Sequence, residues 1–365
     1  DVFRMVEILE SLGAKTSWPD ERTLKIRAAD IKPSKIKKEL VSRFRGSVLL
    51  YGPLLARFGK VTLPQPGGCL IGVRPIDTHL DAFLQLGVRV LSGKNFYSLK
   101  TPEIQAQKKE KQSALLNEFS VTATENIILF ASGLARKTII KGADLDYPTQ
   151  ELVAFLKKMG ARIKIGAFHE IEVEGSRALR GAERQLIYDP IEAGTFILAA
   201  AATRGEVIIE NVEISLLELF LKKLKDAGLP IEVLAPKRIR VRPWKKLNFE
   251  KIQSLPYPGI PSDLQSAFGV LATQAQGPTL IHDPLYEGRL KYLEELNKMG
   301  AKIYFADPHR AIINGPTRLV GRELDTFDLR GGAALIIAGL VAKGKTIVNN
   351  IYQVDRGYER IEERL

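Results

Sequence analysis

The sequence of 365 residues has little of what disulfide-linked, metal-binding or membrane-spanning proteins need. A single cysteine cannot form an intramolecular disulfide, and the four histidines lack the spacing of a zinc site. The longest apolar runs, 193–203 and 331–342, are shorter than the ~20 residues that a membrane span needs. We therefore expect a globular cytoplasmic protein without a signal peptide or a membrane partner.

Phosphate-binding glycine motifs are also missing. No Walker A or GxGxxG sequence occurs, so nucleoside triphosphate and dinucleotide cofactors are not indicated. We expect neither a cofactor nor a metal ion. Apolar residues make up 45% of the chain and charged residues 26%, which is ordinary for a soluble globular protein.

The charge balance indicates an anionic partner. Lys and Arg outnumber Asp and Glu by 54 to 42, which gives a net charge of +12. The lysine-rich runs 35–38, 108–111 and 237–240 are typical of solvated faces. A second group of basic residues stands at expected element ends, where planar guanidinium groups suit phosphate and carboxylate. It comprises Arg45, Arg74, Arg289, Arg330 and Arg356. Without interleaved aromatic residues, this group favours a polyanionic small molecule over a nucleic acid.

A repeat of roughly 70 residues organises the chain. An amphipathic helical stretch ends in glycine, and a short strand follows, in five copies. The glycines are Gly13, Gly87, Gly160, Gly228 and Gly300. In phase with them, segments of small residues precede β-branched strands, and these segments predict helices that are buried on all sides. They are 128–135, 196–203, 268–276 and 333–342.

This pattern predicts an α/β fold. Any α/β protein with glycine-capped helices could show one of the two signals, but their recurrence in phase favours a true repeat. Two domains of three units fit the length better than a solenoid, whose repeats usually have about 20 to 45 residues. We place the division near 186–190, with a first domain of residues 1–187 and a second of residues 188–365.

The single cysteine, Cys69, lies in a segment rich in proline and glycine, 63–79. A lone cysteine is usually a small buried hydrophobic residue. Here the Gly67-Gly68 pair before it and Arg74 after it give the thiol a route to exposure and a lowered pKa. It could therefore serve as a general acid or a nucleophile.

Asp263 follows a proline-rich turn, 258–262, and opens a predicted helix. Such an aspartate is usually an N-cap. The alternative is a general base that the turn holds in place.

Taken together, these segments resemble the enolpyruvyl transferases over nearly the whole chain. The matching motifs are 52–59, 66–69 with 74–79, 258–265, 328–330 and 355–359. The cysteine segment distinguishes one branch of the family from its shikimate-pathway branch, which lacks this cysteine.

The resemblance implies a two-domain fold, an inside-out α/β barrel in which each domain has three β/α units around buried helices. It also implies a reaction in which enolpyruvate moves from phosphoenolpyruvate to the 3′-hydroxyl of UDP-N-acetylglucosamine and phosphate is released. Addition followed by elimination at a tetrahedral ketal is the implied route. No cofactor, nucleic acid or membrane is implied, and we expect a monomer.

The resemblance further assigns roles to single residues. Cys69 matches the residue that protonates phosphoenolpyruvate, and Asp263 matches the carboxylate that takes the hydroxyl proton. Arginines stabilise the developing charge, namely Arg74, Arg330 and Arg356. The expected substrate contacts are Arg45, Arg74, Pro75, Ile76, Asp77, Thr78, His79, Phe119, Ser120, Val121, Asp263, Leu285, Arg289 and Asp328.

Some positions depart from the family pattern. Thr122 stands where the family usually has glycine, and Glu118 where a lysine is common. The family's N-terminal Lys-Asn pair is expected upstream of Asp1. One alternative therefore stays open, a relative that binds a nucleotide sugar without turnover. The net charge of +12 keeps a second one open, a basic nucleic-acid module or a phosphate cyclase built on related repeats.

Overall fold

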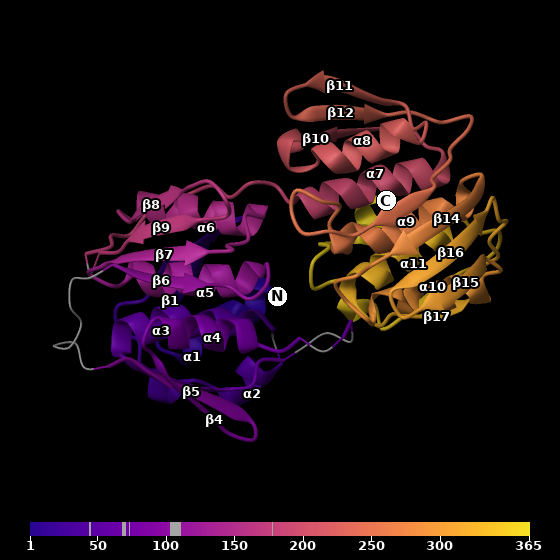
Figure 1. Cartoon of the computed structure of the whole chain (residues 1–365). Coiled ribbons are helices and arrows are strands. Elements are labelled where there is room, and N and C mark those ends of the chain that lie inside the picture. The colour runs from indigo at the N-terminus through magenta and orange to yellow at the C-terminus, as the bar shows by residue number, and fades with distance from the viewer. Residues whose placement is uncertain (44, 68–70, 73, 103–110, 177) are drawn as a thin grey trace. The chain divides into compact units, whose positions relative to one another are not determined.

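The chain divides into two units, which are described separately here (Figure 1). The computed structural model describes residues 1–43, 45–67, 71–72, 74–102, 111–176 and 178–365. The first unit holds Asp1–Gly68 and Arg74–Gln185. The second holds Leu186–Leu365, together with Ile71 and Gly72.

The first unit alternates helices with short strands. Its helices are α1 (Val2–Ser11), α2 (Lys38–Ser42), α3 (Tyr51–Phe58), α4 (Asp77–Gln85), α5 (Val121–Ser132) and α6 (Tyr147–Lys158). Its strands are β1 (Lys15–Asp20), β2 (Thr23–Arg27), β3 (Lys60–Pro64), β4 (Arg89–Ser92), β5 (Phe96–Lys100), β6 (Gln112–Leu115), β7 (Lys137–Lys141), β8 (Arg162–Ile165) and β9 (Ile171–Glu174). The 3₁₀ turns η1 (Pro33–Lys35) and η2 (Arg45–Leu50) connect the early elements.

The second unit alternates in the same way. Its helices are α7 (Pro190–Thr203), α8 (Glu218–Asp226), α9 (Ser262–Gln274), α10 (Tyr292–Lys298), α11 (Leu329–Val341) and α12 (Ile361–Arg364). Its strands are β10 (Val207–Glu210), β11 (Ile231–Ala235), β12 (Arg238–Val241), β13 (Lys251–Gln253), β14 (Gly277–His282), β15 (Lys302–Asp307), β16 (Arg310–Gly315), β17 (Glu323–Asp325) and β18 (Ile347–Asn349). Its 3₁₀ turns are η4 (Ile214–Leu216), η5 (Arg289–Lys291) and η6 (Ile351–Gln353).

The sheets repeat between the units. The four-stranded sheets have the orders β6-β7-β9-β8 and β13-β14-β16-β15, and in both the first pair is parallel and the others antiparallel. The three-stranded sheets β3-β5-β4 and β10-β12-β11 also correspond, and each unit has one two-stranded sheet, β1-β2 or β17-β18. The described residues thus form three sheets per unit. The predicted α/β fold of repeated units is confirmed.

Small side chains let the central helices approach closely, as the sequence predicts. In the second unit α7, α9 and α11 pack against one another. A Cβ atom at Gly194 of α7 would lie 2.7 Å from the side chain of Leu264 on α9. The apolar segments predicted these helices, but all four begin earlier: α5 at Val121, α7 at Pro190, α9 at Ser262 and α11 at Leu329. Their first turns carry polar residues, which the apolar pattern does not include.

Each of the five predicted glycines closes a helix in the left-handed conformation. Their φ angles lie between +80° and +105°. At Gly13 the amide donates to the Glu10 carbonyl oxygen, and the Ala14 amide donates to the Leu9 carbonyl oxygen. This pair of bonds defines the Schellman motif, and it recurs at the other four glycines. The helix ends are therefore fixed by backbone geometry.

Within the described residues, no helix is both long enough and apolar enough to cross a membrane.

Two of these glycines give a matched test of backbone strain against steric contact. Gly13 and Gly160 have nearly equal φ angles, +104° and +103°. A Cβ atom at Gly13 would lie 2.7 Å from the Asp30 carbonyl oxygen. A Cβ atom at Gly160 would have nothing within 4 Å. We expect Gly160→Ala to cost about 1 kcal/mol in the free energy of unfolding through left-handed strain alone. Gly13→Ala should cost a further 1–3 kcal/mol, roughly, because the contact adds to that strain. Urea unfolding measures both, and equal losses would contradict the steric argument.

Candidate active site

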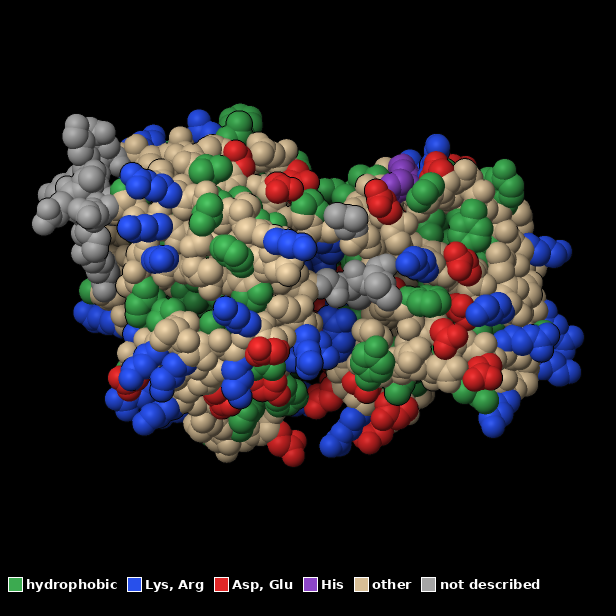
Figure 2. Space-filling model, turned by 90° about the horizontal axis from the view of Figure 1, so that it is seen from below, with side chains coloured by type: hydrophobic (Ala, Val, Ile, Leu, Met, Phe, Trp, Pro, Cys, Tyr) green, Lys and Arg blue, Asp and Glu red, His purple; other side chains and the backbone are tan. Residues whose placement is uncertain are grey.

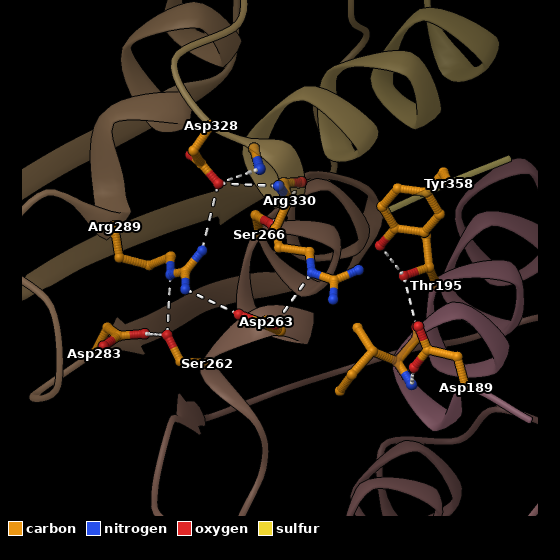
Figure 3. Close-up of polar contacts among 12 residues, drawn as sticks. Asp189, Thr195, Ser262, Asp263, Ser266, Asp283, Arg289, Asp328, Arg330 and Tyr358 are labelled. Carbon is orange, nitrogen blue, oxygen red and sulfur yellow. Dashed lines mark hydrogen bonds and ion pairs between the residues drawn. The ribbon is translucent and has the colours of Figure 1, made fainter. Parts of the chain in front are cut away.

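In the second unit, charged side chains from three segments meet around the carboxylate of Asp263 (Figure 3). Asp263 lies in the first turn of α9, Arg289 begins η5, and Arg330 lies in the first turn of α11. Arg289 Nη2 is 3.0 Å from Asp263 Oδ1, and Arg330 Nε is 3.1 Å from Oδ2. Each carboxylate oxygen therefore accepts from one guanidinium group. The Asp263 side chain remains 40% exposed, against 3% for Arg289.

Asp263 is not the cap of its helix. Pro261 is the N-cap of α9, and the Asp263 side chain points to the arginines instead. Of the two interpretations of this residue, the N-cap is therefore wrong. A carboxylate that is held by two partners on one side and open on the other can accept a proton from a bound molecule.

A second layer of polar groups holds Arg289 in place. Its Nε donates to Ser262 Oγ at 3.0 Å, and Ser262 donates to Asp283 Oδ2 at 2.6 Å. Its Nη1 lies 3.4 Å from Asp328 Oδ1. Asp328 is the N-cap of α11, where the same oxygen accepts from the backbone amides of Arg330 and Gly331. The buried arginine is thus surrounded by carboxylates and a hydroxyl.

These carboxylates keep both arginines charged. Burial lowers the pKa of Arg289, but Asp263, Asp328 and Asp283 outweigh it, so the pKa is raised overall. The pKa of Arg330 is likewise raised, because Asp263, Tyr358 and Asp189 together outweigh burial. Arg330 Nη1 is buried, and among the described residues it has no hydrogen-bond partner. This donor is available to an oxyanion.

Tyr358 and Thr195 support Arg330, and neither was singled out from the sequence. The Arg330 guanidinium carbon lies 5.2 Å from the centroid of the Tyr358 ring. The Tyr358 hydroxyl lies 2.8 Å from Thr195 Oγ1, which donates to the Ile191 carbonyl oxygen in α7. Tyr358 belongs to a recognised motif, 355–359, but Thr195 sits in an apolar helix and gives no signal.

The other predicted residues of this unit lie on the same or adjoining segments. Leu285 is 40% exposed and follows β14, in the loop that leads to Arg289. Arg356 follows η6 and donates to Gln353 Oε1 at 3.1 Å. The backbone amide of Gly288, beside Arg289, donates to the Ile71 carbonyl oxygen. Cys69 itself lies outside the described residues.

In the first unit, the Arg45 side chain fixes the backbone before α4. Its Nη1 and Nη2 donate to the carbonyl oxygens of Arg74 and Pro75, at 2.5 and 3.1 Å. Asp77 then begins α4 and is exposed, while Ile76 is buried. The structure therefore brings Arg45 together with the start of the Arg74–Thr78 segment.

The Phe119–Val121 segment lies at the start of α5. Phe119 is 51% exposed, and its ring centroid is 4.7 Å from that of His169. Ser120 is the N-cap of α5 and accepts from the Ala123 amide. Thr78 donates to Glu118 Oε1 at 3.0 Å, which links α4 to this segment. The predicted contacts of the first unit therefore gather at the beginnings of α4 and α5.

His79 is a buried part of this group. Its Nε2 lies 3.1 Å from Thr122 Oγ1 and its Nδ1 lies 3.0 Å from Asn126 Nδ2. Burial, aided by the charge of Arg45, lowers the pKa of His79 to about 3, so the imidazole is neutral at neutral pH. Its ring is a structural element between α4 and α5. Asn126 was not singled out from the sequence, because an isolated asparagine carries no motif.

The basic side chains form no continuous stripe on the face seen in Figure 2. Within each unit, Lys and Arg side chains stand there in separate groups, with hydrophobic, uncharged and some acidic side chains between them. A nucleic-acid backbone is usually bound by basic residues that cluster on one face. The visible face therefore does not favour a nucleic-acid module.

Comparison with known proteins shows the family of this chain. The family model for EPSP synthase (3-phosphoshikimate 1-carboxyvinyltransferase) matches residues 1–365. UDP-N-acetylglucosamine 1-carboxyvinyltransferase from Treponema denticola is 40% identical over 372 residues, which cover 100% of this chain and 86% of that protein. UDP-N-acetylglucosamine 1-carboxyvinyltransferase 1 from Caldanaerobacter subterraneus subsp. tengcongensis is 40% identical, with the same coverage.

Solved structures show the same fold. The enolpyruvyl transferase NikO from Streptomyces tendae superposes with a TM-score of 0.85 at 22% identity, over 100% of this chain and 85% of that one. EPSP synthase from Acinetobacter baumannii gives 0.71 at 17% identity, over 99% and 86%. The family model and the full-length relatives identify the chain as an enolpyruvyl transferase. The chain belongs to the EPSP synthase family, which confirms the resemblance seen in its motifs.

Glu125 predicts a pH dependence of stability. It is buried in α5, and burial, with the charges of Asp144 and Asp146, raises its pKa from 4.5 to about 7. The folded state therefore resists ionisation, and stability should fall as the pH rises from about 4.5 to about 7. Glu125→Gln removes this loss. When the pH is raised from 5 to 8, the free energy of unfolding of the variant should increase by about 2–3 kcal/mol relative to that of the parent, as measured by urea unfolding. Parallel pH profiles would contradict the assignment.

Asp328 offers a second test, because it is both an N-cap and a partner of buried Arg289. Asp328→Ala removes both functions and should cost roughly 2–4 kcal/mol in the free energy of unfolding. Asp328→Asn keeps an acceptor oxygen for the Arg330 and Gly331 amides, so it should cost less than half as much. Urea unfolding of the two variants measures the difference, and equal losses would show that the cap contributes nothing.

Proposed function

We propose that this protein transfers the enolpyruvyl group of phosphoenolpyruvate to the 3′-hydroxyl of UDP-N-acetylglucosamine and releases inorganic phosphate. The observation that carries the proposal is the Asp263 carboxylate, held by the buried Arg289 and by Arg330 and still 40% exposed. The full-length relatives named UDP-N-acetylglucosamine 1-carboxyvinyltransferase support this choice of acceptor.

The proposed reaction needs a base, an acid and cationic groups. In the addition step, Asp263 takes the proton of the 3′-hydroxyl as its oxygen bonds to C2 of phosphoenolpyruvate, and Cys69 protonates C3. The product is a tetrahedral ketal that still carries phosphate. In the elimination step, C3 gives a proton back to the Cys69 thiolate that the addition step left, and the C2–C3 double bond re-forms. The C2–O bond to phosphate breaks, and the phosphate leaves with the electron pair of that bond and takes the proton that Asp263 had accepted. Atoms and charge balance without a redox partner.

The arginines supply the electrostatic part of the proposal. Arg330 presents a buried donor without a protein partner among the described residues, which fits a phosphate or carboxylate oxygen. We assign the same role to Arg74 and Arg356, while Arg289 positions Asp263. Donors that are fixed before the reaction stabilise developing charge at no cost of reorganisation. This is the advantage of holding the arginines rigidly between carboxylates.

The remaining contacts are assigned to the sugar nucleotide. In the first unit these are Arg45, Arg74, Pro75, Ile76, Asp77, Thr78, His79, Phe119, Ser120 and Val121. In the second unit they are Asp263, Leu285, Arg289 and Asp328. Because Ile76 and His79 are buried, we assign their contacts to backbone atoms.

Phosphate release from phosphoenolpyruvate tests the proposal directly. The purified chain should release phosphate when UDP-N-acetylglucosamine is present, and neither substrate alone nor shikimate 3-phosphate as acceptor should give release. Cys69→Ala should abolish turnover, whereas Cys69→Asp should keep part of it, because a carboxylic acid can still donate the proton.

Three other outcomes would count against parts of the proposal. Release with shikimate 3-phosphate instead would show that the acceptor is wrong. Binding of UDP-N-acetylglucosamine without release would favour the relative that binds without turnover. Full activity of Cys69→Ala would remove the thiol from the mechanism.

A further inference from the structure

A directed chain of hydrogen bonds crosses the core of the first unit and ends at Thr122. It begins at Asn126, which is fully buried in α5. The backbone amide of Gly52 donates to Asn126 Oδ1 at 2.8 Å, so this oxygen is the acceptor side of the amide. Asn126 Nδ2 then faces two acceptors, the Val48 carbonyl oxygen at 2.8 Å and His79 Nδ1 at 3.0 Å.

The direction of the next bond follows from this arrangement. The two hydrogens of Asn126 Nδ2 serve Val48 and His79, so His79 Nδ1 must accept. A neutral imidazole with an accepting Nδ1 carries its proton on Nε2. His79 Nε2 therefore donates to Thr122 Oγ1 at 3.1 Å. The hydrogen-bond partners of His79 therefore determine which of its ring nitrogens carries the proton.

Thr122 is then left with a hydrogen to donate. Its oxygen accepts from His79, and no acceptor for its own hydroxyl hydrogen occurs among the described residues. The residue is half-buried in the first turn of α5, two positions after Ser120. Because threonine is β-branched, its rotamer is restricted, and the contact with His79 restricts it further. A donor without a partner costs free energy when water is excluded, whereas an unused lone pair costs little.

We propose that Thr122 is a specificity-determining residue that donates a hydrogen bond to an acceptor oxygen of the uridine nucleotide. This inference rests on the proposed function, in which the adjoining Phe119–Val121 segment contacts the sugar nucleotide. The oxygen is a carbonyl of the pyrimidine base or a diphosphate oxygen, and both have the same acceptor chemistry. The hydrogen-bond chain ensures that the threonine meets this oxygen as a donor.

Two substitutions separate the hydroxyl from the shape of the side chain. Thr122→Val keeps the branched shape and removes the hydroxyl, and Thr122→Ser keeps the hydroxyl. The KM for UDP-N-acetylglucosamine should rise about 3–10-fold in the valine variant, the usual loss for one neutral hydrogen bond. Its kcat and its KM for phosphoenolpyruvate should stay within about twofold of the parent. The serine variant should stay within about twofold in all three.

A purely structural role would give a different pattern. The valine variant also leaves His79 Nε2 without its acceptor, so urea unfolding is measured alongside. A loss of stability with no change in the KM for UDP-N-acetylglucosamine would overturn the proposal. Equal effects of valine and serine would overturn it as well, since only one of them lacks the hydroxyl.

The experiment also distinguishes this inference from the proposed function. If the parent gives no turnover, the same variants are compared by calorimetric binding of UDP-N-acetylglucosamine. A 3–10-fold weaker binding of the valine variant alone would then support Thr122 although the reaction fails. Conversely, normal turnover with no difference between the variants would support the proposed reaction and contradict the proposed role of Thr122.

CDP-N-acetylglucosamine tests whether the oxygen is O4 of the base. Cytosine replaces the O4 acceptor of uracil with an amino donor. If Thr122 contacts O4, the parent should prefer the uridine compound and Thr122→Val should lose most of that preference. If Thr122 contacts O2 of the base or a phosphate oxygen, which both compounds share, the variant should lose equally with both.

Discussion

Burial of the central helices on nearly every side determines where this protein places its polar chemistry. An α-helix satisfies its own backbone except in its first and last turns, so polar side chains in the core are most easily held there. Asp189 and Asp328 cap α7 and α11, Ser120 caps α5, and Asp263 lies in the first turn of α9. Carboxylates are also favoured at the positive end of the helix dipole. The candidate site is built from these first turns.

Once carboxylates occupy the first turns of α9 and α11, arginines can be buried beside them. An unpaired guanidinium in this environment would be expensive to desolvate, and removal of one partner from a buried ion pair is strongly destabilising. Arg289 has partners in Asp263, Asp328 and Ser262, so its position is determined by the beginnings of two helices, α9 and α11. The stability of the core and the order of the site therefore depend on the same contacts. Rigid cationic groups follow from the packing and need no flexible loop to hold them.

The sequence predicted the parts of this structure that depend on local pattern. The glycines at 13, 87, 160, 228 and 300 mark helix ends because only a left-handed residue can close a helix in that way. Segments of small residues predicted the buried helices, since their composition reports close packing. The partners of Asp263 could not be derived in this manner, because Arg289 and Arg330 come from distant segments and neither spacing nor composition links them. Thr195 and Asn126 were missed for the same reason: each acts through a contact across the core.

The two units hold their polar groups by different means, and the difference matters for recognition. In the second unit ion pairs dominate. The electrostatic interaction between charged groups extends over several ångströms and depends little on their orientation. In the first unit the chain from Asn126 through His79 to Thr122 is neutral, and its effect depends on which atom carries each hydrogen. A charged cluster suits a reaction in which charge develops on phosphate and carboxylate. A neutral chain with a fixed direction suits the discrimination of a base or sugar, because it rejects a molecule that presents a donor where an acceptor is required.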